Sequence, residues 1–197
     1  YVFMGDASGL SASAATTLSG PSDNSQFGTV SSAGDVNGDG FADAIVGAPW
    51  ANAYGGSAFV YLGGPNGLSS SPAATLSGPN DSTFGGAVSN AGDINGDGYD
   101  DAIGSYDSVY TYFGGTNGAS DPPAILIPPG DSASIYGYDV IRVGDINRDG
   151  YDDVVIGAKF DNQFTGRAYV YFGGATGLAS SPALVLPGPD GIGGHFG

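Results

Sequence analysis

The sequence predicts an all-β fold built from repeated four-stranded antiparallel sheets, because of its composition and an internal repeat. Of its 197 residues, 37 are Gly and 12 are Pro, whereas all 20 acidic residues are Asp and only one residue is Lys. Asp, Gly and Pro favour turns, and the strong helix formers Glu and Lys are nearly absent. Hydrophobic residues make up 41% of the chain, which is enough to bury a core and excludes a disordered chain. The composition therefore predicts short strands joined by tight turns.

One strand-and-turn segment occurs four times along the chain. Alternating aromatic and aliphatic residues run into a Gly-Gly or Gly-Asp pair at 1–6, 59–64, 110–115 and 169–174, so that successive copies start 58, 51 and 59 residues apart. A short apolar segment follows each copy, at 15–18, 74–76, 125–127 and 184–186. Alternation bounded by turn residues predicts a β-hairpin, so each copy supplies two strands.

The other half of each unit holds a nine-residue loop rich in Asp. The loops at 35–43, 93–101 and 145–153 share the pattern Asp-x-Asn-x-Asp-Gly-x-x-Asp, whose members are numbered 1 to 9 below. A strand precedes each loop, and an apolar strand follows it, at 44–46, 102–103 and 154–156. With four short strands in roughly 50–60 residues, one unit has the size of a β-propeller blade.

The repeat predicts about three and a half blades in a single propeller region, residues 1–197. Its expected parts are the outer strands of one blade (1–26), three blades (27–83, 84–135 and 136–195) and the start of another (196–197). Propellers close with roughly four to eight blades, so we expect this region to be part of a seven-bladed ring. Either the rest of a longer chain or a second copy, in a homodimer, would complete that ring.

The Asp loops have the residue pattern of a calcium site. A tight turn brings the side-chain oxygens at positions 1, 3 and 5 together, and Gly at position 6 supplies a left-handed backbone conformation. The carbonyl at position 7 and the Asp at position 9 complete the expected ligand set, as in a shortened EF-hand loop. Oxygen ligands alone select a hard cation, and Ca²⁺ fits better than Mg²⁺, which demands tighter octahedral geometry.

Such loops could also be turn formers only, because Asn-Gly and Asp-Gly pairs favour turns. Three copies that all keep positions 1, 3, 5, 6 and 9 favour metal binding instead. Position 8 is Asp100 or Asp152 in two loops and Ala42 in the first, so these two Asp residues are expected to be solvated neighbours. The predicted ligands of three Ca²⁺ ions are Asp35, Asn37, Asp39, Phe41, Asp43, Asp93, Asn95, Asp97, Tyr99, Asp101, Asp145, Asn147, Asp149, Tyr151 and Asp153.

The segments that flank the loops resemble a known repeat. Phe27-Gly28 and Gly47-Ala48-Pro49 flank the first loop, and the later units open with Phe84-Gly85 and Tyr136-Gly137. This pattern resembles the FG-GAP repeat of integrin α-subunit propellers and of many bacterial surface proteins, and the resemblance covers essentially the whole chain. It implies a β-propeller with Ca²⁺ in the hairpin between the first two strands of each blade, opposite the usual ligand-binding loops. Gly-Ala-Pro becomes Gly-Ser-Tyr and Gly-Ala-Lys in the second and third units, which leaves the metal loops intact.

Charge and residue types exclude several classes of function. The formal net charge of −16 disfavours nucleic-acid and anionic-membrane partners, and no apolar run is long enough for membrane insertion. The chain has no Cys, so it has no disulfide and no thiolate nucleophile. His195 is the only His and is expected to be a boundary residue. We therefore expect no enzymatic activity.

The function that these features favour is a calcium-binding recognition or adhesion module for a protein or glycan, secreted or at the cell surface. A lectin is the first alternative, with sugars stacked on aromatic residues in the variable loops. These residues are Trp50, Tyr54, Tyr106, Phe160 and Phe164, for which ordinary packing between blades is the simpler expectation. A non-catalytic propeller in a larger secreted enzyme, such as a phospholipase or a polysaccharide-active enzyme, is the other alternative.

Overall fold

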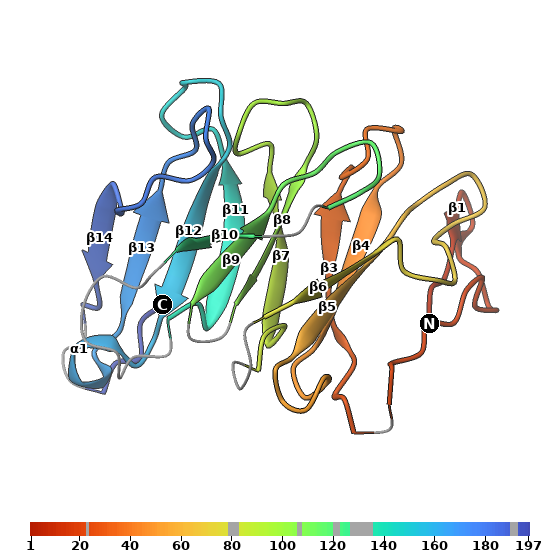
Figure 1. Ribbon diagram of the computed structural model, residues 1–197, viewed down its shortest axis with the longest axis horizontal. Helices are drawn as coiled ribbons and strands as arrows, with labels where there is room; N and C mark the ends of the chain where they lie inside the picture. Colours follow the sequence, from red (N-terminus) through yellow and green to blue (C-terminus); the bar gives the residue numbers. More distant parts are fainter. Residues whose placement is uncertain (23, 79–82, 106–107, 120–122, 127–135, 190–192) are drawn as a thin grey trace.

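Three four-stranded antiparallel sheets stand side by side in the computed structural model (Figure 1). The structure describes residues 1–22, 24–78, 83–105, 108–119, 123–126, 136–189 and 193–197. Each sheet is a meander in which strands adjacent in sequence pair with each other. This arrangement confirms the predicted all-β fold of propeller blades; closure into a seven-bladed ring stays a prediction.

The three sheets are called the first, second and third blades below. The first contains β3 (Thr29–Gly34), β4 (Asp43–Ala48), β5 (Ser57–Tyr61) and β6 (Ala74–Ser77). The second contains β7 (Ala87–Gly92), β8 (Asp101–Ser105), β9 (Val109–Tyr112) and β10 (Ala124–Leu126). The third contains β11 (Asp139–Gly144), β12 (Asp153–Ala158), β13 (Arg167–Tyr171) and β14 (Leu184–Pro187).

The N-terminal part forms a smaller antiparallel pair, β1 (Gly5–Asp6) and β2 (Gly9–Leu10). The strands expected at 1–4 and 15–18 meet only at one bridge, between Val2 and Thr16. Isolated two-stranded hairpins are marginally stable in water, which agrees with the shortness of this pair.

One short helix departs from the all-β prediction. It is α1 (Asp161–Phe164), a single turn in the loop between β12 and β13. Its Asp161 carboxylate pairs with Arg167 at 3.3 Å and also accepts a hydrogen bond from the Tyr169 hydroxyl, which ties the turn to β13. Among the described residues, no helix is long and apolar enough to cross a membrane.

The hydrophobic core lies between neighbouring blades. One buried cluster joins the first and second blades, with Val36, Ile45 and Leu76 on one side and Phe84 and Tyr112 on the other. A second cluster joins the second and third blades through the equivalent positions. Each blade therefore has an apolar face toward each neighbour, because strand residues alternate between the two faces of the sheet.

The Phe-Gly pairs at 84–85 and 196–197 are inserted into the preceding blade. Phe84 forms a parallel bridge with Gly56, and a Cβ placed on Gly85 would lie 3.2 Å from Ala48 N, in the Gly-Ala-Pro segment of the first blade. Phe196 forms the same parallel bridge with Gly166 of the third blade. Glycine at these places lets two backbones approach closely, which gives the spacing of the repeat a physical reason.

Candidate metal centres

The three Asp loops connect the first two strands of each blade. They join β3 to β4, β7 to β8 and β11 to β12, all at the same end of the blades (Figure 1). A β-bulge disturbs the register just before each loop, beside Gly34, Gly92 and Gly144. Bulges bend and twist a strand, so each loop starts from the same distorted strand end.

In the first loop, the side chains at positions 1, 3 and 5 fold onto the loop backbone. Asp35 Oδ1 and Asn37 Oδ1 both accept hydrogen bonds from the Asp39 N–H, at 3.0 and 3.2 Å. Asp35 Oδ2 accepts from the Gly40 N–H at 2.9 Å, and Gly40 has φ +87°. Asp39 Oδ1 in turn accepts from the Phe41 N–H at 2.9 Å. The three side chains that the sequence assigned to one cation therefore lie together.

The second and third loops repeat this geometry. Asp93 and Asn95 share the Asp97 N–H at 3.0 and 2.9 Å, and Asp145 and Asn147 share the Asp149 N–H at 3.1 and 3.0 Å. The third loop differs at position 4, where Arg148 has φ +63° in place of a Gly. Left-handed backbone is unfavourable for residues other than Gly, by about 1–2 kcal/mol.

The Asp at position 9 faces the protein interior. Asp43, Asp101 and Asp153 are all buried. Asp101 Oδ2 accepts from the Ile94 N–H at 3.0 Å, and its Oδ1 accepts from the Gly114 N–H at 2.8 Å. Asp43 and Asp153 bind the equivalent pairs of amides in their own blades. Each of these carboxylates therefore fastens the loop to the Gly-Gly turn after the third strand.

Burial has an electrostatic cost at position 9. Desolvation by burial, with smaller contributions from the charges of Asp97 and Asp93, raises the pKa of Asp101 to about 7, against the two backbone hydrogen bonds. Burial raises the pKa of Asp43 in the same way, with a smaller contribution from Asp39 and Asp35. A bound cation would lower this carboxylate repulsion, because opposite charge favours the ionised form.

The position-8 residues are not solvated neighbours as predicted; they connect adjacent blades. Asp100 Oδ2 accepts a hydrogen bond from the Asp35 N–H at 2.9 Å, while the Asp100 N–H donates to the Asp35 carbonyl at 3.1 Å. Asp152 makes the same pair of bonds to Asp93, at 3.0 Å each. Asp152 also forms an ion pair with Arg142 at 2.7 Å. The inter-blade Asp contact, as this pair of bonds is called below, holds position 1 of one metal loop from the next blade.

The side chain at position 7 also contacts the metal loop of the preceding blade. A Cβ placed on Gly38 would lie 2.8 Å from Tyr99 Cε1, and one on Gly96 would lie 2.7 Å from Tyr151 Cε1. Each tyrosine ring therefore covers a glycine of the loop before it. From the sequence, only the carbonyl at this position was predicted to have a role, because the contacts of its side chain arise only between two neighbouring blades.

The donor set at positions 1, 3 and 5 fits a hard cation. In the described part of the chain, no group of three or more Asp or His side chains is arranged to hold a metal ion. The reason is that the position-9 carboxylate faces the interior, so each loop brings together only two carboxylates and one Asn amide, at positions 1, 5 and 3. Carboxylate oxygens have several lone pairs, so an oxygen that accepts an N–H can also bind a cation.

The aromatic residues of the variable loops lie at the opposite end of the blades. Trp50, Tyr54 and Phe164 are exposed, contrary to the expectation that they pack between blades, and the Trp50 and Tyr54 rings are 6.4 Å apart. Phe160 packs edge-on against Phe164 and His195. Tyr106 lies outside the described residues.

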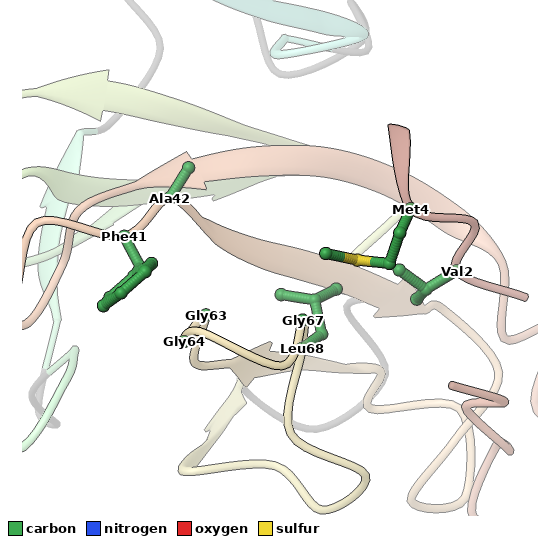
Figure 2. A pocket seen from close by; sticks show the side chains of 8 residues that line it. All are labelled: Val2, Met4, Phe41, Ala42, Gly63, Gly64, Gly67 and Leu68. Atoms are coloured by element: carbon green, nitrogen blue, oxygen red, sulfur yellow. The ribbon is translucent and has the colours of Figure 1, made fainter. Parts of the chain in front are cut away.

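A shallow hollow of about 220 Å³ separates the N-terminal pair from the first blade. Figure 2 shows Val2 and Met4 on one side of it and Phe41 and Ala42 on the other, with Leu68 between them. Its lining is mostly apolar and offers no charged side chain, so this hollow has no evident chemistry. Ala42 stands here at position 8, where the other blades carry the Asp of the inter-blade contact.

Comparison with known proteins gives matches over most of the chain. The FG-GAP repeat matches residues 27–61 and 139–171. Integrin alpha-6 of Gallus gallus is 36% identical over 148 residues, and integrin alpha-6 of Homo sapiens is 35% identical over 147 residues; each alignment covers 70% of this chain. Integrin alpha-7 of Homo sapiens is 30% identical over 190 residues, or 90% of this chain. The chain spans 13–16% of the length of these relatives.

Proposed function

The chain belongs to the FG-GAP repeat proteins and has an integrin alpha-like propeller fold, and from this premise we propose that it is a calcium-binding recognition module. Its task is adhesion to, or recognition of, a protein or glycan outside the cell. The observation that carries the proposal is the same arrangement of oxygens at positions 1, 3 and 5 in all three loops. The similarity to integrin alpha chains supports the recognition role.

Calcium would act as a structural ion in these loops. In the first loop, Asp35, Asn37 and Asp39 would hold it, together with the carbonyl of Phe41, and the buried Asp43 would anchor the loop behind them. The ion supplies positive charge where the loop concentrates negative charge. An ion that binds only the folded protein at a hundredfold excess over its Kd stabilises it by about 2.7 kcal/mol per site. Extracellular modules bind calcium with Kd values on the order of 10⁻⁴ to 10⁻³ M, so these sites would fill outside the cytosol.

Native mass spectrometry in calcium tests this proposal directly. We expect three Ca²⁺ ions per chain, and two after Asp39→Ser, which removes an exposed position-5 carboxylate from the first loop. Asp6→Asn is the matched control, because Asp6 is an exposed Asp outside the loops, and it should leave the count at three. A chain that binds no calcium at millimolar concentration would refute the calcium part of the proposal.

The recognition role has no need of catalytic groups. The only His packs against two phenylalanine rings, and the position-9 carboxylates are engaged by backbone amides. These engagements support a non-catalytic module. Binding to candidate extracellular proteins, measured with and without calcium, tests the role; binding that is unchanged by a chelator would separate recognition from the metal loops.

A lectin is the second candidate, favoured by the exposed pair Trp50 and Tyr54. Exposed aromatic rings offer apolar faces on which sugars can stack, and the tilted Trp50 and Tyr54 rings offer two such faces. A glycan array in calcium, repeated with Trp50→Ala, distinguishes the candidates. Specific glycan binding that is lost in the variant would favour the lectin, and no binding across the array would favour a protein ligand.

A further inference from the structure

The inter-blade Asp contact comes from a segment that belongs to one metal loop and touches another. Asp100 stands between Tyr99, whose carbonyl is a predicted ligand of the second loop, and the buried Asp101. Its carboxylate and its backbone N–H both bond to Asp35, a predicted ligand of the first loop, at 2.9 and 3.1 Å. One three-residue segment therefore serves the first and the second loop together.

The Gly-Gly turn of the second blade makes another connection between the same two loops. The Gly115 N–H donates to the carbonyl of Val36, at position 2 of the first loop, at 2.8 Å. The Gly114 N–H donates to Asp101 Oδ1 at 2.8 Å. Asp101 Oδ2 in turn accepts from the N–H of Ile94, at position 2 of the second loop, at 3.0 Å. These hydrogen bonds join the two loops through a single turn of backbone.

The second and third loops are joined in the same way. Asp152 bonds to Asp93 through its carboxylate and its N–H, at 3.0 Å each. The Gly174 N–H donates to the Ile94 carbonyl at 3.0 Å. Asp153 accepts hydrogen bonds from the equivalent pair of amides in the third blade. The three loops are therefore connected in series.

Each connection also includes an aromatic ring. Tyr99 covers Gly38 of the first loop, and Tyr151 covers Gly96 of the second. The position-7 residue that would offer its carbonyl to one cation thus packs its ring on the loop of the preceding blade.

An empty loop has an electrostatic reason to loosen, because like charges at positions 1 and 5 repel each other. With a cation in the second loop, the Tyr99 carbonyl would be held as a ligand, and Asp100 would be held with it. Asp35 would then already be fixed by Asp100 before the first loop is filled. A cation that orders fewer groups on binding has a higher affinity.

We propose that Asp100 and Asp152 are positioning residues that couple the metal loops, so that a cation in one loop raises the affinity of the loop in the neighbouring blade. The coupling rests on the proposed calcium binding, and linkage makes it reciprocal between the two loops. Repulsion between two bound cations acts in the opposite direction. Neighbouring sheets pack about 10 Å apart, which is close to the Debye length at physiological ionic strength, so salt screens much of this repulsion.

Calcium binding to chains with one or two intact loops measures the coupling. Asp149→Ser disables the third loop in every chain, since it removes the exposed position-5 carboxylate. Adding Asp97→Ser or Asp39→Ser leaves only the first or only the second loop, and native mass spectrometry gives the affinity of each loop alone. The populations of the two-loop chain with no ion, one ion and two ions then give the coupling factor. We expect a factor of at least about five.

Three substitutions in these chains test the role of Asp100. Asp100→Ala should reduce the coupling factor to less than about two, because only the backbone bonds remain. Asp100→Asn keeps an acceptor oxygen and should retain most of the coupling, which separates positioning from charge. Asp6→Ala is the matched control: it removes an exposed carboxylate outside the loops and should leave the factor unchanged.

Hydrogen exchange at the Asp35 amide gives a second readout, which needs no ion in the first loop. In the chain that keeps only the second loop, calcium should slow exchange of the Asp35 N–H by at least about threefold. Asp100→Ala should abolish this slowing, because the N–H has then lost its acceptor.

Two loops that bind calcium with a coupling factor of one or less would overturn the coupling and leave the proposed function intact. A factor that persists in Asp100→Ala, or an Asp35 exchange rate that calcium does not change, would overturn the positioning role. Chains in which neither loop binds calcium at millimolar concentration would overturn the proposed calcium binding itself, and the coupling with it.

Discussion

Replacing Asp100 by Ala removes the side chain that joins the second blade to the first metal loop. Asp100 Oδ2 lies 2.9 Å from the Asp35 nitrogen and accepts its N–H. The reciprocal bond from the Asp100 N–H to the Asp35 carbonyl is made by backbone and survives the change. The variant therefore loses one charge-assisted hydrogen bond and leaves the Asp35 N–H without its acceptor.

The size of this loss follows from the partial burial of both residues. A hydrogen bond to a charged group contributes about 1.5–3 kcal/mol, and an unsatisfied buried donor costs about 1–3 kcal/mol. Because Asp35 is only partly buried, water can replace some of the lost bond. We expect a decrease of about 1–2 kcal/mol in the free energy of unfolding, or roughly 2–8 °C in Tm for a chain of this size.

Thermal and urea unfolding followed by circular dichroism, both in excess calcium, measure this loss. Asp100→Asn keeps an acceptor oxygen and should cost less than half as much. Ala42→Asp is the positional control, because Ala42 is exposed and lines the apolar hollow instead of contacting a metal loop; it should change stability by less than about 0.5 kcal/mol. An Asp100→Ala protein as stable as its parent would refute the inter-blade role that the structure assigns to position 8.

Three further predictions concern two equivalent glycines, two equivalent isoleucines and the ions. Gly34→Ala and Gly144→Ala share the strain of a positive φ, but only Gly34→Ala meets the Asp100 carboxylate, so it should cost about 1–3 kcal/mol more by urea unfolding; equal costs would contradict the close fit. Ile94→Ala, at a position that is 0% exposed, should cost about 2–5 kcal/mol, and Ile146→Ala, at the equivalent position that is 53% exposed, less than 1 kcal/mol; a large loss at Ile146 would contradict the exposure of this side chain. Chelation by EDTA should lower Tm markedly, since each filled site stabilises by about 2.7 kcal/mol at a hundredfold excess of calcium over Kd; a calorimetric scan that does not shift would argue against a structural ion.

Local patterns predicted the blade correctly because each depends on short-range geometry. The strands after the loops, at 44–46, 102–103 and 154–156, fall within β4, β8 and β12. Alternation of side chains along a strand and the turn preference of Asn-Gly and Gly-Gly act within a few residues. They are therefore visible in each copy of the sequence repeat. The N-terminal segment was predicted less well, because the strands expected at 1–4 and 15–18 meet only at the bridge between Val2 and Thr16.

The repeat pattern could not predict the contacts between blades. Position 8 was interpreted as solvated because it varies between Ala42 and Asp, and a position that varies within a repeat usually makes no specific contact. In the structure, Asp100 and Asp152 instead bond to the metal loop of the preceding blade.

The amino-acid sequence by itself determined the blades, the nine-residue loops and the convergence of positions 1, 3 and 5, because all of these close within a single turn or hairpin. Tertiary structure decided which carboxylates face the loop and which face the interior. Asp101 is buried because the Gly-Gly turn of its own blade, 13 residues further along the chain, brings the Gly114 amide against it. Asp100, its neighbour in sequence, points to the preceding blade instead, because adjacent residues of a strand end project to opposite faces.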